Sequence, residues 1–157
     1  MEENPRETWE PLVGRFVLTC GDVELALLQV YWNLSLHGQY EEKIKLLGLG
    51  KKAKFIRERI PEFKLNKDLI KRVDNALSES IQLAHQRNLV AHNPLYLDVY
   101  SDEKGNFTLV PTIRSLRDDE KHISLEDLIN LNTKASKLSS ELQKMVIEVA
   151  DAQCPVT

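Results

Sequence analysis

Cysteine is scarce in this chain: among 157 residues it occurs only as Cys20 and Cys154. Two cysteines are too few for a disulfide framework or for a cysteine-rich metal site. Cys20 stands among apolar residues, so we expect its thiol to be buried in the core. The low cysteine content favours a reducing, cytoplasmic setting.

Signals for export or membrane insertion are also missing. Residues 1–5 are acidic and polar and do not resemble a signal peptide. The rather apolar stretch over residues 16–36 is interrupted by Asp22, Glu24 and Asn33, and a charged side chain is costly in the middle of a bilayer. We therefore expect a cytoplasmic protein that does not span the membrane.

The sequence further lacks the short motifs of several enzyme classes. It contains no glycine-rich phosphate loop, no nucleotidyltransferase fingerprint and no nucleophile elbow. His85 and His92 would lie about 10 Å apart along a helix, which is too far for both to chelate one metal ion. No two carboxylates have a spacing diagnostic of metal-dependent hydrolysis. We therefore expect neither a bound metal ion nor a cofactor.

The overall composition, 42% hydrophobic and 29% charged, is ordinary for a globular protein, and the length predicts one domain over residues 1–157. A formal net charge of −3 argues against a protein that coats nucleic acid over its whole surface. Positive charge is concentrated between residues 51 and 72, at Lys51, Lys52, Lys54, Arg57, Arg59, Lys64, Lys67, Lys71 and Arg72. This segment is either a solvated helix face or a basic surface beside an RNA path.

Apolar residues that recur at steps of three and four predict a long first helix. We expect residues 1–7 to be frayed, Thr8 to cap the helix, and the helix to run to about His37, where Gly38 ends it. Glu24 lies beside the apolar stripe. It is either an exposed residue at the edge of that stripe or, if buried, a partner for Arg87.

The middle of the chain predicts shorter elements and then a central helix. Residues 40–50 indicate a short helix or turn, and residues 51–60 a short basic helix with Phe55 and Ile56 on its inner side. Asn66 is the expected cap of the central helix. A last long helix follows Ser124, which resembles the start of a capping box with Asp127.

Between the central and last helices the pattern changes to alternation. Residues 95–100 and 107–113 alternate in polarity around a turn-rich segment, which predicts a β-hairpin. Because two strands alone are only marginally stable, we expect the hairpin to lie against the helices. The expected fold is mainly α, a bundle of about four to five helices with a small β-hairpin after the central helix.

The end of the central helix carries a polar cluster. Arg87, Asn88 and His92 fall in its last turns, because Pro94 cannot continue a helix. Asn88 occupies a position where the stripe predicts an apolar residue, so it is either partnered in a polar site, facing a cavity or subunit interface, or simply exposed at a fraying end. A fixed positive charge and a group that titrates near neutrality suit an anionic, phosphate-bearing ligand.

The segment Arg87-Asn88-Leu89-Val90-Ala91-His92 resembles the R-x-x-x-x-H motif of the HEPN superfamily (higher eukaryotes and prokaryotes nucleotide-binding domains). The family is similar in plan, a small helical bundle, often dimeric, with the motif late in a long helix. The resemblance implies a metal-independent endoribonuclease in which the RNA's own 2′-hydroxyl attacks the adjacent phosphate. It assigns proton transfer to His92, phosphate stabilisation to Arg87, and orientation of His92 or the phosphate to Asn88.

The resemblance also implies partners and a biological setting. RNA is the expected ligand, a homodimer with facing motifs the expected assembly, and a toxin or defence system the expected context, with an antitoxin or regulatory protein as a further partner. Some family members carry a tyrosine two residues after the histidine, where this chain has Pro94. The alternative is a catalytically inactive HEPN-like module, dimeric and regulatory, that binds protein, nucleotide or RNA.

Overall fold

The computed structural model describes residues 4–35 and 41–153. In these residues the α-helices are α1 (Pro5–Leu34), α2 (Leu49–Arg59), α3 (Lys67–His92) and α4 (Leu125–Gln153). Two short 3-10 helices, η1 (Glu42–Leu46) and η2 (Ile60–Glu62), flank α2. The prediction of a mainly α bundle with a small hairpin after the central helix is confirmed.

Helix α1 begins earlier than predicted. Asn4, and not Thr8, is the N-cap, because its side chain accepts a hydrogen bond from the backbone N–H of Arg6 at 3.2 Å. Pro5 takes the first helical position, where the missing N–H costs nothing. The prediction that residues 1–7 are frayed is therefore wrong for residues 5–7, since a cap and a proline fix the first turn.

The helix ends agree with the sequence to different degrees. Helix α1 is assigned to Leu34, and the predicted end at His37 and Gly38 lies outside the described residues. Residues 42–46 form η1, within the predicted helix-or-turn segment, of which residue 40 is likewise not described. Helix α2 starts at Leu49, two residues before the predicted start, because Gly48 takes the extended conformation of an N-cap.

Two of the three predicted side-chain caps, those at Asn66 and Ser124, are confirmed. The Asn66 side chain accepts a hydrogen bond from the backbone N–H of Leu69 at 2.8 Å, at the start of α3. Before α4, the Asp127 carboxylate accepts from the Ser124 N–H at 2.9 Å, and the Ser124 hydroxyl oxygen accepts from the Asp127 N–H at 3.1 Å. Such caps satisfy N–H groups that have no partner within the helix.

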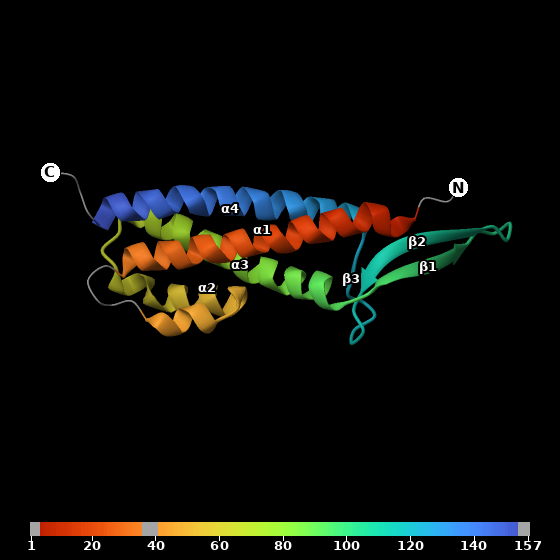
Figure 1. Ribbon diagram of the computed structural model, residues 1–157, viewed down its shortest axis with the longest axis horizontal. Helices are drawn as coiled ribbons and strands as arrows, with labels where there is room; N and C mark the ends of the chain where they lie inside the picture. The colour runs from red at the N-terminus through yellow and green to blue at the C-terminus, as the bar shows by residue number, and fades with distance from the viewer. Residues whose placement is uncertain (1–3, 36–40, 154–157) are drawn as a thin grey trace.

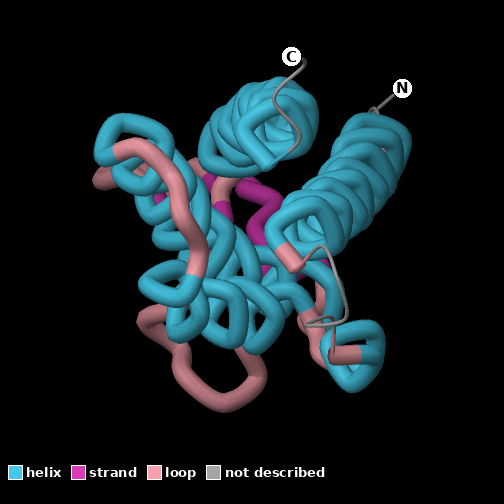
Figure 2. Tube along the Cα trace, turned by 90° about the vertical axis from the view of Figure 1, so that its left-hand side faces the viewer, coloured by secondary structure: helices cyan, strands magenta, loops and turns pink. Residues whose placement is uncertain are grey.

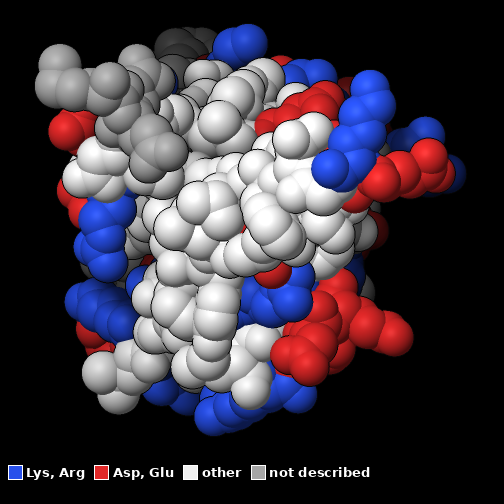
Figure 3. All heavy atoms as spheres, turned by 90° about the vertical axis from the view of Figure 1, so that its right-hand side faces the viewer, with Lys and Arg blue, Asp and Glu red and all other residues white. Residues whose placement is uncertain are grey.

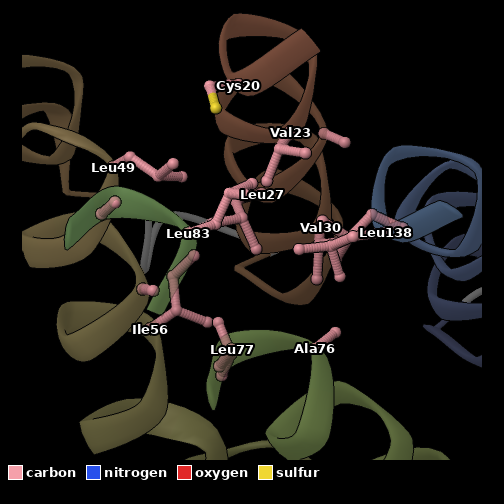
Figure 4. Packing of buried hydrophobic residues seen from close by; sticks show 14 of the residues in the cluster. Cys20, Val23, Leu27, Val30, Leu49, Ile56, Ala76, Leu77, Leu83 and Leu138 are labelled. Carbon is pink, nitrogen blue, oxygen red and sulfur yellow. The ribbon is translucent and has the colours of Figure 1, made fainter. Parts of the chain in front are cut away.

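Helices α1 and α4 run side by side in the same direction, and α3 runs the opposite way beneath them (Figure 1). The end-on view shows the helices gathered around a common centre (Figure 2). There, Val23, Leu27 and Val30 of α1 meet Leu77 of α3 and Leu138 of α4 (Figure 4). Helix α2 adds Leu49 and Ile56 to the same core, and it packs along α3 rather than along α4.

The sheet consists of β1 (Leu95–Ser101), β2 (Phe107–Arg114) and β3 (His122–Ile123), in that order and antiparallel. The sequence predicted β1 and β2 but no third strand, because a two-residue strand leaves no alternation to detect. At the hairpin turn Gly105 has φ of 79°, a left-handed conformation that favours glycine. The Asp102 carboxylate accepts hydrogen bonds from the backbone N–H groups of Lys104 and Asn106.

The expectation that the hairpin lies against the helices is wrong for most of its length. Only its base enters the core, through the buried Ile113 and the half-buried Leu95, with Ile123 of β3 beside them. The outer part of the hairpin, with its turn, extends beyond the helices (Figure 1). The base is held because β2 pairs with β3 and contacts α3, whereas large apolar residues further along the hairpin stay exposed.

Candidate functional site

The end of α3 is fixed by Asn93, which stands between His92 and Pro94. The Asn93 side-chain amide donates to the carbonyl of Leu89 at 2.8 Å, and its oxygen accepts from the backbone N–H of Leu116 at 3.0 Å. Asn93 thereby ties the last turn of the helix to the loop that follows β2. His92 is the final helical residue and is exposed to solvent, as the position of Pro94 predicted.

A cavity of about 580 Å³ lies between α1, the start of α2 and α3. Its walls include Arg87 and Asn88 from the polar cluster that the sequence singled out. Further lining residues are Cys20 and Glu24 of α1, Gly48, Lys51 and Lys54 around the start of α2, and His85 of α3. A cavity of this volume is in the range that holds a small ligand or one nucleotide unit of a longer one.

Positive charge dominates the cavity. Within residues 4–35 and 41–153, no ion pair is recorded for Lys51, Lys54 or Arg87, and the carboxylate of Glu24 is already paired with Lys52 at 2.8 Å. The first turn of α2 also lines the cavity, at residues 48–51. Its N-cap, Gly48, has no side chain that could accept hydrogen bonds from the first N–H groups of the helix. Uncapped helix N-termini attract anions.

The three arginines of the segment 51–72 form ion pairs away from the cavity. Arg57 pairs with Asp74 at 2.7 Å, Arg59 with Glu41 at 2.7 Å, and Arg72 with Glu148 at 2.5 Å. These ion pairs join neighbouring elements and neutralise the arginines. A solvated face describes the exposed Lys64, Lys67 and Lys71, whereas Lys51 and Lys54 line the cavity. A basic surface beside an RNA path stays a prediction.

Arg87 and Asn88 lie together on the cavity wall. The Arg87 guanidinium donates a hydrogen bond to the Asn88 side-chain oxygen at 3.3 Å. Asn88 is exposed, so its amide does not carry the free-energy cost of a buried polar group without a partner. It interrupts the apolar stripe because this part of α3 faces the cavity. Arg87 is half-buried and lines the cavity. An arginine in such a position buries its aliphatic stem and keeps its guanidinium accessible.

His92 lies outside the cavity but on the same side of α3. Ile81, His85, Asn88 and His92 follow one another at steps of four, three and four, and such positions fall within about 60° on a helix. The first three line the cavity, and His92 follows about 6 Å further along the axis than Asn88. No hydrogen bond between Arg87 and His92 is recorded in the described residues.

His85 is the functional candidate that sequence reasoning missed. Its spacing from His92 excludes a shared metal ion, and the family motif does not include it. The structure places it on the cavity wall with Arg87 and Asn88. The spacing of 81, 85 and 88 was visible in the sequence, but which flank of α3 faces α2 depends on tertiary packing.

Cys20 is a core thiol, as predicted, and it also contributes to the cavity wall. Burial raises the pKa of the Cys20 thiol to about 12, and the positive charge of Arg87 opposes this shift. The thiol is therefore protonated at neutral pH.

Glu24 of the cavity wall pairs with Lys52 and not with Arg87, and we expect the two partners to respond differently to mutation. The Lys52 side chain is 4% exposed, whereas that of Glu24 is 36% exposed. Glu24→Ala leaves a buried ammonium without its partner, at a cost of about 1–3 kcal/mol or more. Lys52→Met keeps the packing and leaves a carboxylate that water can solvate, so its cost should stay near 1 kcal/mol. Urea denaturation of both variants measures the difference, and equal destabilisation would contradict this account.

Comparisons of the chain with protein-family models, with curated proteins and with solved structures find no match. In the described residues, no group of three or more histidine, cysteine, aspartate or glutamate side chains is placed to hold a metal ion. None of the described helices combines the length and apolar character needed to cross a bilayer. The cavity and the α3 terminus are therefore the features of this chain that bear on its function.

Proposed function

We propose that this chain is a metal-independent endoribonuclease of the HEPN type, with Arg87, Asn88 and His92 as its functional residues. The observation that supports the proposal best is the position of Arg87 and Asn88 in a cation-lined cavity, with His92 exposed further along the same side of α3. A phosphate in the cavity would meet Arg87, Lys51 and Lys54 together. Guanidinium and ammonium groups bind phosphate oxygens by charge-assisted hydrogen bonds.

In the proposed reaction the 2′-oxygen of a ribose attacks the adjacent phosphorus. The bond from phosphorus to the 5′-oxygen breaks, so the products are a 2′,3′-cyclic phosphate and a 5′-hydroxyl. An imidazole accepts or donates protons near neutral pH, so His92 is assigned one of the two transfers, from the 2′-hydroxyl or to the leaving oxygen. Arg87 stabilises the charge that develops on the phosphate. Asn88 accepts a hydrogen bond from Arg87 and is assigned the orientation of His92 or of the phosphate.

The arrangement along α3 favours an extended ligand over a mononucleotide. His92 lies beyond the cavity, so a ligand confined to the cavity would not reach it. A single RNA strand that passes along α3 would place one phosphate beside Arg87 and a neighbouring ribose beside His92. The second transfer needs another acid–base group, which the family resemblance assigns to a second copy of the chain.

A direct test is incubation of the purified protein with a labelled single-stranded RNA in the presence of EDTA. We expect endonucleolytic cleavage, with products that end in a 2′,3′-cyclic phosphate. Protein carrying His92→Ala, purified in the same way, controls for contaminating ribonuclease. Cleavage that requires an added divalent metal, or that is equal in the two preparations, would contradict the proposal.

A binding module without catalysis is the second candidate. It is favoured by the absence of a recorded contact between Arg87 and His92 in the described residues and by the gathering of cations at the cavity, not at His92. Such a module should retain RNA without cleaving it, and Lys51→Ala and Lys54→Ala should each weaken binding and reduce its salt dependence. Fluorescence anisotropy at several salt concentrations measures this.

A further inference from the structure

The cavity between α1, α2 and α3 contains one carboxylate among several cations. Of the described residues that line it, Glu24 is the only acidic one, whereas Lys51, Lys54 and Arg87 are basic. A carboxylate repels the phosphate that these cations attract, so phosphate binding alone does not explain its position. Because a carboxylate only accepts hydrogen bonds, Glu24 is suited to a different part of the ligand, one that donates them.

Lys52 fixes the position of this carboxylate. The Lys52 ammonium donates a hydrogen bond to Oε1 of Glu24 at 2.8 Å, and Lys52 is buried and is not among the residues that line the cavity. A buried ion pair adds little net stability, because removing both charges from water costs about as much as their attraction gains. Within residues 4–35 and 41–153 no partner is recorded for Oε2 of Glu24, so that oxygen is available to a ligand.

Two groups on α3 complement Glu24 as hydrogen-bond donors. The Asn88 side-chain oxygen accepts from Arg87 at 3.3 Å, which leaves the amide N–H groups of Asn88 for a ligand. His85 is exposed about one turn earlier on the same wall, and a ring nitrogen of an imidazole can donate as well. The walls also include the apolar residues Val17, Cys20, Leu49, Ile81 and Ala84. A ligand with a flat apolar body and polar edges fits such a combination.

Positive charge is not spread evenly over the molecule. The surface at the hairpin end is broadly uncharged, with charged side chains around it (Figure 3). At the cavity, by contrast, Lys51, Lys54 and Arg87 gather, and no ion pair neutralises them within the described part of the chain. A phosphate attached to the ligand would bind these cations by charge-assisted hydrogen bonds, which leaves the flat body of the ligand for the walls beside Glu24.

We propose that the cavity binds a guanine base together with its phosphate. Guanine places two donors, N1–H and N2–H₂, side by side, where one carboxylate accepts from both. Its O6 and N7 atoms are acceptors and suit the donors of Asn88, His85 or Arg87. Adenine and cytosine place a ring-nitrogen acceptor beside their amino group, and uracil places a carbonyl oxygen on each side of its N–H. Each of these three bases would therefore set a lone pair against the Glu24 carboxylate.

This inference rests on the proposed function where the guanine belongs to an RNA strand, and it then assigns a base preference to the nucleotide held in the cavity. A free guanine nucleotide offers the same chemistry. The deciding measurement is therefore binding, which does not require cleavage. Guanine-selective binding without cleavage would refute the ribonuclease and support this site, whereas cleavage without guanine-selective binding would do the opposite.

Isothermal titration calorimetry of the full chain with the four nucleoside 5′-monophosphates tests the site. Guanosine monophosphate should bind about tenfold more tightly than the other three. Glu24→Gln should abolish this preference, because the glutamine oxygen stays with Lys52 and an N–H₂ donor replaces the free acceptor. Asp22→Asn is the matched control and should keep the preference, since Asp22 is an exposed α1 residue that does not line the cavity. Equal binding of the four nucleotides, or equal effects of the two variants, would overturn the proposal.

A second comparison uses only the wild-type chain, so it does not depend on how the variants fold. Inosine monophosphate differs from guanosine monophosphate by the missing N2 amino group and should bind about tenfold less tightly. Equal affinities would overturn the proposal. Fluorescence anisotropy with a labelled uridine oligonucleotide, with and without one guanosine, separates the two sources of guanine. Tighter binding of the strand with guanosine identifies RNA as the source, and equal binding of both strands by a chain that prefers guanosine monophosphate identifies a free nucleotide.

Discussion

His92→Ala should reduce RNA cleavage by about 10²–10⁴-fold, the usual contribution of a general acid or base. The loss follows because no other histidine occupies the exposed end of α3, and an alanine there can neither accept nor donate a proton. Binding of RNA to the cavity should change little, since His92 is not among its lining residues. Single-turnover cleavage and fluorescence anisotropy, measured on the same RNA, separate the two effects.

The control for this variant is His122→Ala, because His122 is another exposed histidine, lies in β3 and does not line the cavity. It should cleave at the wild-type rate. His85→Ala is not a neutral control, since His85 lines the cavity and its loss should weaken RNA binding. Cleavage by His92→Ala at the wild-type rate would refute the assignment of proton transfer to this residue.

Arg87→Ala should reduce cleavage by about 10²–10³-fold, because it removes the group that stabilises charge on the phosphate. It should also weaken RNA binding, in contrast to His92→Ala, since Arg87 lies on the cavity wall. Arg87→Lys should recover only part of the activity, because an ammonium lacks the two-pronged geometry of a guanidinium. The same pair of assays measures cleavage and binding.

Arg6→Ala is the control for the charge change, because Arg6 is an exposed arginine at the start of α1 that, among residues 4–35 and 41–153, pairs only with the exposed Glu10. Circular dichroism and urea denaturation should show that Arg87→Ala folds as the wild type does. If Arg87→Ala loses stability in proportion to activity, Arg87 acts as a structural residue. Full activity of Arg87→Lys would show that charge alone is sufficient at this position.

The sequence by itself determined the elements that depend on local chemistry. Side-chain caps at Asn66 and Ser124, the steps of three and four along the helices, and the break at Pro94 each involve residues a few positions apart. Such interactions form in the same way whatever the rest of the chain does. For the same reason the sequence correctly placed His92 at a helix terminus and predicted the strands of the hairpin.

Only the tertiary structure decided which polar groups meet. Arg57 and Arg59 are neutralised by Asp74 and Glu41, whereas Lys51 and Lys54 face a cavity, and nothing in their local sequence distinguishes these two outcomes. The flank of α3 that carries His85 became a cavity wall because α1 and α2 pack beside it.

The hairpin shows the same limit most clearly. Its alternation predicted strands, but the sequence could not tell whether its apolar face would meet the helices or remain uncovered. Periodicity reports which side chains share a face, because that depends on backbone geometry alone. What covers that face depends on the paths of segments distant in the chain, and here the outer part of the hairpin lies past the ends of the helices (Figure 1).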